Sequence, residues 1–162
     1  KRPAVKILGA GEASKHLMGG KVDLTYSGGR WAGPKAFEEA GVTQKDIKYA
    51  SIYDSFTITV LETLEDLGFC EVGKGGKFVS DGNLISGVGK LPFNTDGGGL
   101  CNNHPGNRGG MTKILEAVRQ IRGEAHPKVQ VPNCDIALAH GTGGLLGSRM
   151  GSGTVILGNQ DS

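Results

Sequence analysis

Several features are scarce in this chain of 162 residues, and each absence excludes a class of protein. No apolar run approaches the roughly 18 residues that a membrane-spanning helix needs, and the N-terminus lacks the apolar segment of a signal peptide. The net charge is only +2, with basic and acidic residues interspersed, unlike a nucleic-acid-binding surface. We therefore expect a cytoplasmic protein that binds neither a membrane nor nucleic acid.

Cysteine is also scarce. The chain has three cysteines, an odd number placed far apart at positions 70, 101 and 134. This spacing predicts neither a disulfide framework nor a paired zinc motif, so we expect reduced thiols and no bound metal. Cys101 is a candidate nucleophile by its chemistry, but the spacing identifies no activating partner, so a small buried residue is the simpler interpretation.

Glycine, in contrast, is abundant. The chain has 29 glycines, about twice the average usage of roughly 7%. They form no collagen period and no low-complexity tract, but gather at residues 73–76, 97–99, 109–110 and 141–153. Clusters of glycine between periodic segments predict tight loops, where the backbone comes close to a neighbour that a side chain would block.

Helical spacing occurs in three segments. Pro34 stands in the first turn of a short predicted helix that Gly41 ends. A longer amphipathic helix is predicted to begin at Ser55 and to end at Gly68. The third predicted helix ends at Gly123 and has one apolar stripe. The residues of this stripe are Met111, Ile114, Leu115, Val118 and Ile121.

Short β-prone or apolar runs bounded by glycine predict strands. These runs are residues 4–14, 47–53, 134–141 and 151–158. Residues 73–87 have turn chemistry and predict an exposed ribbon or loop. The last two strands would form a hairpin, so the order of strands and helices predicts a single α/β domain with a mixed sheet.

Polar motifs stand at the ends of three predicted elements, where an α/β sheet usually presents its site. They are YDSF at 53–56, NNHPG at 102–106, and HGTGG at 140–144 in the turn of the final hairpin. Two histidines, each beside glycines and each at the end of an element, are poorly suited to fill a core. Because an imidazole both donates and accepts protons near neutral pH, His104 and His140 are the candidate acid–base pair.

Taken alone, each motif also has a simpler interpretation. Asp54 or Ser55 is a typical cap for the helix that follows. Tyr53 fits a core aromatic residue with its hydroxyl at the rim. His104 fits an ordinary turn residue, and His140 fits a buried structural histidine.

The order of these motifs resembles the C-terminal domain of the thiolase superfamily. The matching segments are YDSF, then NTDGGGL and NHPG before a helix, then HGTGG before the closing strand GTVILG. The nearest branch is the lipid-transfer-protein or sterol-carrier-protein-type thiolases, and the resemblance covers essentially the whole chain, residues 1–162. It implies a thiolase-like α/β half, with a mixed sheet of about five strands covered by helices on both faces.

For activity, the resemblance implies an acyl-CoA thiolase or acyltransferase that makes or breaks a carbon–carbon bond next to a CoA thioester. In this family the N-terminal half supplies the nucleophilic cysteine, and this chain matches only the second half. We therefore expect the isolated chain to be inactive. A coenzyme A thioester is the implied substrate, and no permanently bound cofactor is expected.

The family's motifs align with this chain, but some of the motif residues differ. Tyr53 stands at the Asn of the family's NEAF motif, His104 at the His of its GHP motif, and His140 at or near the Cys of its CxG motif. By this resemblance His104 stabilises the oxyanion, His140 moves a proton at Cα, and Tyr53 donates a hydrogen bond. Both imidazoles should converge on one pocket. The glycines expected to let the backbone approach the thioester are Gly98, Gly99, Gly143 and Gly144.

The resemblance also implies partners and an alternative reaction. Expected partners are the N-terminal thiolase domain and a second copy in a homodimer. The alternative is a retro-aldolase that cleaves a β-hydroxyacyl-CoA, such as a steroid or lipid side chain, with Tyr53 as the base and a zinc-ribbon/OB-fold partner protein.

Two further hypotheses come from other classes. One is a dinucleotide-binding domain, suggested by ILGAGEAS, although Ser14 stands where the third glycine belongs. The other is a structural module in which both histidines only satisfy loop backbone.

Overall fold

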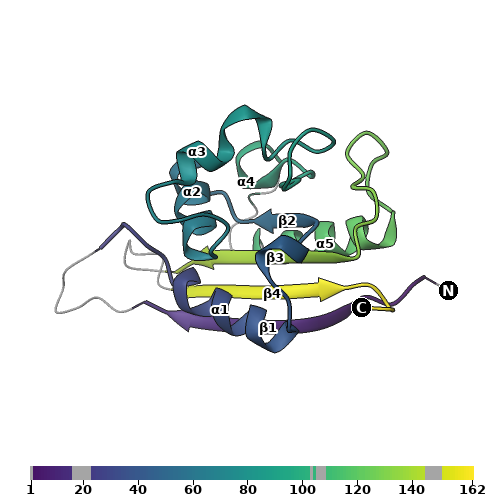
Figure 1. The fold of residues 1–162 in the computed structure, drawn as a ribbon, viewed down its shortest axis with the longest axis horizontal. Helices are drawn as coiled ribbons and strands as arrows, with labels where there is room; N and C mark the ends of the chain where they lie inside the picture. Colours follow the sequence, from purple (N-terminus) through teal and green to yellow (C-terminus); the bar gives the residue numbers. More distant parts are fainter. Residues whose placement is uncertain (1, 16–22, 103, 105–108, 145–150) are drawn as a thin grey trace.

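The computed structural model describes residues 2–15, 23–102, 104, 109–144 and 151–162. Within these ranges four strands form one mixed sheet in the order β1-β4-β3-β2 (Figure 1). The strands are β1 (Lys6–Ser14), β2 (Tyr49–Ile52), β3 (Ile136–Gly143) and β4 (Gly151–Gly158). β4 runs antiparallel to both β1 and β3, whereas β2 runs parallel to β3. The predicted mixed α/β sheet is confirmed.

The predicted number of strands is slightly wrong, because the described chain has four strands where about five were expected. Along the edge of β2, an isolated parallel bridge joins Ala50 to Phe93. The Asn94 N–H also donates to the Ala50 carbonyl oxygen at 3.1 Å. Residues 93 and 94 therefore pair with the edge of the sheet where a fifth strand would lie, but too briefly to form one.

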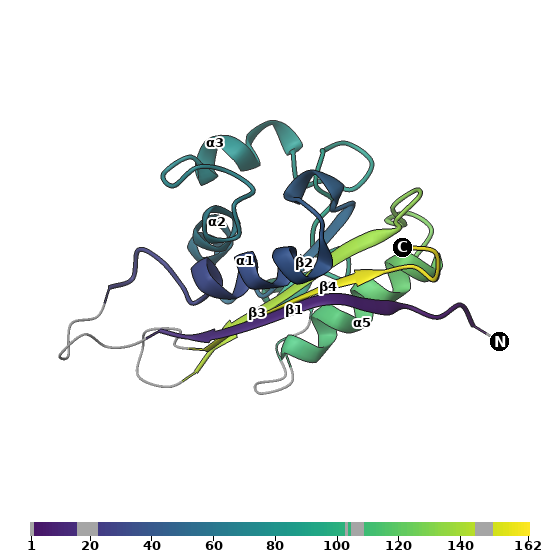
Figure 2. The same cartoon turned by 60° about the horizontal axis from the view of Figure 1, so that its bottom comes forward.

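Helices cover both faces of the sheet, as expected (Figure 2). On one face lie α1 (Gly29–Ala40), α2 (Thr57–Asp66) and α3 (Gly75–Val79), and on the other lies α5 (Gly109–Arg122). The remaining short elements are η1 (Gln44–Asp46), η2 (Ser80–Gly82) and α4 (Gly98–Cys101). Among the described residues, no helix combines the length and apolarity needed to cross a membrane.

The sheet separates two hydrophobic cores. The core under α1 and α2 contains Phe37, Leu64 and Leu138. The core under α5 contains Ala117 and Ala139. Because successive residues of a strand point to opposite faces, the neighbours Leu138 and Ala139 enter different cores. The small side chains of Ala117 on α5 and Ala139 on β3 let this helix and strand lie close together.

Two local predictions are corrected by the structure. α1 begins at Gly29, not near Pro34, because the Ser27 hydroxyl accepts the Gly29 N–H at 3.0 Å and starts the helix earlier. Within residues 73–87, where a ribbon or loop was expected, residues 75–82 form α3 and η2, and residues 83–87 lie in turns and a bend. Gly41 ends α1 as predicted, with a φ of 67°.

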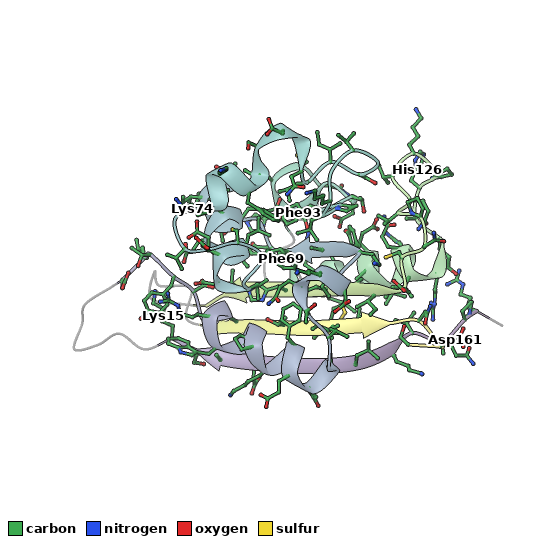
Figure 3. The ribbon with its side chains drawn as sticks, in the orientation of Figure 1. Lys15, Phe69, Lys74, Phe93, His126 and Asp161 are labelled. Carbon is green, nitrogen blue, oxygen red and sulfur yellow. The ribbon has the colours of Figure 1, made fainter. Side chains whose placement is uncertain are left out.

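The carboxyl ends of β2 and β3 lie at the same edge of the sheet, since the two strands are parallel (Figure 1). Tyr53 follows β2 there, and Gly144 follows β3. His126, on the loop after α5, lies at the opposite end of the molecule (Figure 3). The fold therefore brings the motifs at 53–56 and 140–144 together at one edge, where a site is expected.

Candidate functional site

A phenol and an imidazole form the centre of the candidate site. The Tyr53 N–H donates to the His140 carbonyl oxygen at 2.9 Å, which extends the β2–β3 pairing by one residue. The Tyr53 hydroxyl lies 2.8 Å from Nδ1 of His104, which is exposed. When the imidazole carries its proton on Nε2, the phenol donates to Nδ1 and the Nε2–H can donate elsewhere. The pair can therefore pass a proton between its members and still bind an oxygen atom.

A cavity of about 560 Å³ opens beside this pair. This volume lies within the usual range for small-molecule sites, roughly 300–1,000 Å³. The described residues that line it are Tyr53, His104, Gly109, Gly110, Gly141, Thr142, Gly143, Gly144 and Gly151. Most of this wall is glycine backbone, so the phenol and the imidazole supply its proton-transfer groups.

Gly109 sets the position of the Tyr53 ring. A Cβ atom at Gly109 would lie 2.8 Å from Cε2 of that ring, closer than carbon atoms approach. Because glycine has no side chain, the ring packs directly against the first turn of α5. This contact fixes the direction in which the phenol points.

Asp54, the next residue, holds the glycine loop. Its buried carboxylate accepts the Gly99 N–H at 2.6 Å and the Leu100 N–H at 3.3 Å. A Cβ atom at Gly98 would collide with the same carboxylate, and φ at Gly98 is 61°. Asp54 is therefore not the cap of α2, whose N-cap is Phe56. Gly98 and Gly99 contact Asp54 and lie outside the described wall of the cavity.

Removing the Asp54 carboxylate should destabilise the protein. The Asp54→Ala variant leaves two backbone N–H groups without their charged acceptor, and such hydrogen bonds are worth about 1.5–3 kcal/mol. We expect the free energy of unfolding in urea to fall by about 2 kcal/mol, and by less for Asp54→Asn, which keeps one acceptor oxygen. The exposed Asp161 is the matched control, since Asp161→Ala should change it by less than about 0.5 kcal/mol. Equal losses in Asp54→Ala and Asp161→Ala would contradict the anchoring role.

A buried polar network ties the start of the same loop to α5. The Thr95 hydroxyl donates to Oε1 of Glu116 at 2.7 Å, and the Gln120 amide donates to the Thr95 oxygen at 2.8 Å. One turn earlier on α5, Nζ of Lys113 lies 3.9 Å from Oδ1 of Asp96. Buried polar groups need such partners to offset the loss of water. α5 therefore supports both the loop that leads to His104 and the ring of Tyr53.

His140 lies inside β3 and not in a turn, because the strand continues to Gly143. Its ring is only 1% exposed, and Nδ1 lies 2.8 Å from the Thr154 hydroxyl oxygen. A Cβ atom at Gly29 would lie 3.2 Å from Cε1, so the ring packs beneath the start of α1. Burial lowers the pKa of His140 from 6.5 to about 4. The imidazole is therefore neutral at physiological pH.

The two candidate histidines do not meet. Alternation along β3 places His140 on the face of Leu138 and α1, whereas Gly141 faces α5 and lines the cavity. The expected convergence of His104 and His140 on one pocket is therefore wrong, and the structure pairs His104 with Tyr53. The sequence did contain a signal for this placement. His140 stands two residues after a buried leucine in a strand, so its side chain points to the same buried face as that leucine.

The remaining candidates are also placed by the structure. Gly143 and Gly144 line the cavity, and their approach to a thioester stays a prediction. Cys101 is exposed at the end of α4, and no cysteine is among the described residues of the wall. The described residues contain no cluster of side chains that could hold a metal. The dinucleotide-binding hypothesis is wrong, because residues 9–14 lie within β1, whereas the glycines of that fingerprint form the turn after a strand.

Known proteins resemble this chain in sequence. The family described as "Thiolase C-terminal domain-like" matches residues 11–159. An "Acetyl-CoA acetyltransferase" from Methanothermobacter thermautotrophicus is 36% identical over 128 residues, which are 79% of this chain and 32% of the relative. A "Steroid side-chain-cleaving aldolase" from Thermomonospora curvata is 45% identical over 91 residues, which are 56% of this chain and 22% of the relative. The chain thus spans a third or less of these relatives.

A solved structure, the "Ltp2-ChsH2(DUF35) aldolase", has the same fold. It superposes with a TM-score of 0.83 at 33% sequence identity. The match covers 98% of this chain and 40% of that chain. Acetyltransferase and aldolase relatives therefore share the framework on which Tyr53 and His104 stand.

Proposed function

Because the chain belongs to the thiolase C-terminal domain-like family, we propose that it is the C-terminal half of an enzyme that makes or breaks a carbon–carbon bond next to a CoA thioester. One observation carries this proposal: the Tyr53 hydroxyl and Nδ1 of His104 lie 2.8 Å apart at the wall of the cavity. Such reactions move a proton and place negative charge on the thioester oxygen. A hydrogen-bonded phenol and imidazole serve both needs.

His104 and Tyr53 have separate tasks in this proposal. The Nε2–H of His104 donates to the thioester oxygen as it becomes negative, a kind of bond worth about 2.7–4 kcal/mol of the barrier. The Tyr53 hydroxyl carries the proton that must enter or leave. The backbone at Gly143 and Gly144 has no side chain to keep the substrate from this pair.

For the thiolase or acyltransferase reaction, a nucleophilic cysteine must be added to this pair. The described wall of the cavity supplies none, so the proposal assigns it to an N-terminal half of the full-length protein. The acetyltransferase relative supports the thiolase or acyltransferase reaction. It also follows that residues 1–162 alone should not turn over acyl-CoA.

Retro-aldol cleavage is the second candidate, and the hydrogen bond between the phenol and an imidazole favours it. The β-hydroxyl proton passes to the Tyr53 oxygen while the phenol proton passes to Nδ1 of His104. The Cα–Cβ bond then breaks, and its electron pair forms the thioester enolate. Protonation at Cα gives a shorter acyl-CoA, and the former β carbon leaves as a carbonyl group. The aldolase relatives support this reaction.

Product analysis of the full-length protein tests the proposed function. A thiolase should cleave a 3-oxoacyl-CoA only when free coenzyme A is added, and should show a covalent acyl adduct by mass spectrometry. A retro-aldolase should cleave a 3-hydroxyacyl-CoA without added coenzyme A and without an adduct. Failure to cleave or form either compound would contradict the proposed function.

His140 is proposed as a positioning residue. Its carbonyl oxygen accepts the Tyr53 N–H, and its neutral ring joins β3 to β4 through Thr154. Both contacts set the end of β3 against the first residue after β2. In this proposal His140 acts through Tyr53 and does not touch the substrate.

Partners are also part of the proposal. Met111 and Leu115 on α5 are 58% and 51% exposed, large apolar side chains that an N-terminal half or a second copy would cover. The aldolase of the solved structure is named together with a second protein, ChsH2(DUF35). That pairing supports a zinc-ribbon/OB-fold partner for the full-length protein here.

A further inference from the structure

One asparagine side chain takes the place of a strand backbone at the edge of β2. Beside this edge, the Pro92 carbonyl oxygen accepts the Ala50 N–H at 3.0 Å, and the Asn94 N–H donates to the Ala50 carbonyl oxygen at 3.1 Å. A parallel strand that continued here would pair with Ile52 next through its own backbone. The Asn94 side chain does so instead. Its Oδ1 accepts the Ile52 N–H at 2.9 Å, and its Nδ2 donates to the Ile52 carbonyl oxygen at 2.8 Å.

The backbone of Asn94 turns away from the sheet at this point. Its φ is 42°, in the left-handed region that few residues other than glycine adopt. Its carbonyl oxygen accepts the Gly97 N–H at 2.9 Å, so the chain turns into the glycine loop. Asparagine tolerates this conformation, and its side-chain amide has the donor and acceptor of a peptide group. Asn94 therefore ends the pairing of the backbone and continues it with its side chain.

The two sides of Asn94 lead to the two members of the Tyr53–His104 pair. Ile52 directly precedes Tyr53, whose own N–H is bonded to β3 on the opposite edge at 2.9 Å. β2 is thus held on both edges up to the residue that carries the phenol. In the other direction, the chain runs from Asn94 through the loop that Asp54 anchors and on to His104. Asn94 therefore ties the segment of the imidazole to the strand of the phenol.

We propose that Asn94 is a positioning residue that keeps the Tyr53 hydroxyl within hydrogen-bond distance of Nδ1 of His104. The effect of this role on the reaction rate rests on the proposed function. The hydroxyl stands at the far end of a long side chain, so a small movement of the backbone at Tyr53 displaces it further. A misplacement of about 1 Å can cost about a hundredfold in rate. Asn94 is not among the described residues of the cavity wall and acts through Tyr53.

The nitrogen chemical shift of Nδ1 of His104 tests this role without any substrate. It is measured by NMR on the full-length protein with ¹⁵N-labelled histidine. Tyr53→Phe removes the phenol hydroxyl and gives the full change in this chemical shift. Asn94→Gly should give at least half of that change. Because glycine adopts the φ of Asn94 without strain, this variant removes the two side-chain bonds and adds no steric conflict.

Asn83→Gly is the matched control. The Asn83 side chain is half-buried and also bonds to two backbone groups, the Phe78 carbonyl oxygen at 2.9 Å and the Lys90 N–H at 3.1 Å. Its loss should leave the Nδ1 chemical shift of His104 unchanged and kcat within about twofold. Asn94→Gly should lower kcat at least about tenfold and change KM less than threefold, because positioning acts on the reacting pair.

The outcomes separate this inference from the proposed function. No change in Tyr53→Phe, less than half of that change in Asn94→Gly, or an equal change in Asn83→Gly would overturn the inference. If Asn94→Gly does not fold, Asn94→Asp replaces it with the same expected change, because aspartate tolerates this φ and keeps the acceptor but loses the donor. A changed Nδ1 chemical shift with an unchanged kcat would contradict the proposed function and leave the positioning of the pair supported.

Discussion

The His104→Ala variant of the full-length protein is expected to lose at least about a hundredfold in kcat/KM. The imidazole is both the hydrogen-bond partner of Tyr53 and the proposed donor to the thioester oxygen. A positioned acid–base group contributes about 10²–10⁴-fold, and one oxyanion donor contributes a similar amount. Steady-state kinetics with an acyl-CoA that the wild type converts measures the loss.

His126→Ala is the control for this loss. That side chain is exposed, and it lies at the opposite end of the molecule from the carboxyl ends of β2 and β3 (Figure 3). Its removal should leave kcat/KM within about threefold, as expected for a surface residue away from a site. If His104→Ala were equally mild, the structural-module hypothesis would hold, in which His104 only satisfies its loop.

The second large effect concerns stability and pH. His140 is neutral in the fold because burial lowers its pKa to about 4, against 6.5 for the free side chain. Between these values the unfolded chain binds a proton that the folded chain does not, so stability falls as the pH falls from 6.5 towards 4. This shift in the pKa corresponds to a loss of about 3 kcal/mol in the free energy of unfolding.

A comparison with His140→Asn isolates this contribution. Asparagine does not titrate, and its side chain can still bond to Thr154. Urea unfolding of both proteins between pH 7 and pH 4 should show the wild type losing about 3 kcal/mol more than the variant. A constant difference across this range would mean that the folded state accommodates a charged His140.

Much of the fold could be predicted because local patterns and packing agree. The helix predicted to end at Gly123 is α5, and Ile114, Val118 and Ile121 of its apolar stripe pack on the core, whereas Met111 and Leu115 are exposed. The start of α1 could not be predicted because it depends on Ser27, whose hydroxyl also donates to Asp66 of α2 at 2.8 Å. A contact across 39 residues leaves no periodic signal in the sequence.

The candidate site could be predicted in part. The sequence identifies Tyr53 but not its partner, because the bond to His104 joins residues 51 positions apart. The sequence indicates only a helix cap at Asp54. In the structure the carboxylate accepts a backbone N–H of the glycine loop, and this role depends on where that loop folds back. The sequence places His140 in the pocket because the glycine-rich motif resembles a turn, whereas glycines 141 and 143 continue the strand.

The central claim is that Tyr53 and His104 act as one hydrogen-bonded pair on one substrate. A double-mutant cycle of kcat/KM with Tyr53→Phe, His104→Ala and the double variant tests it most directly. We predict that Tyr53→Phe, which keeps the ring against Gly109, also costs about a hundredfold. We further predict that kcat/KM of the double variant is at most about tenfold below that of the less active single variant. Losses that multiply to the product of the two single effects would contradict the claim.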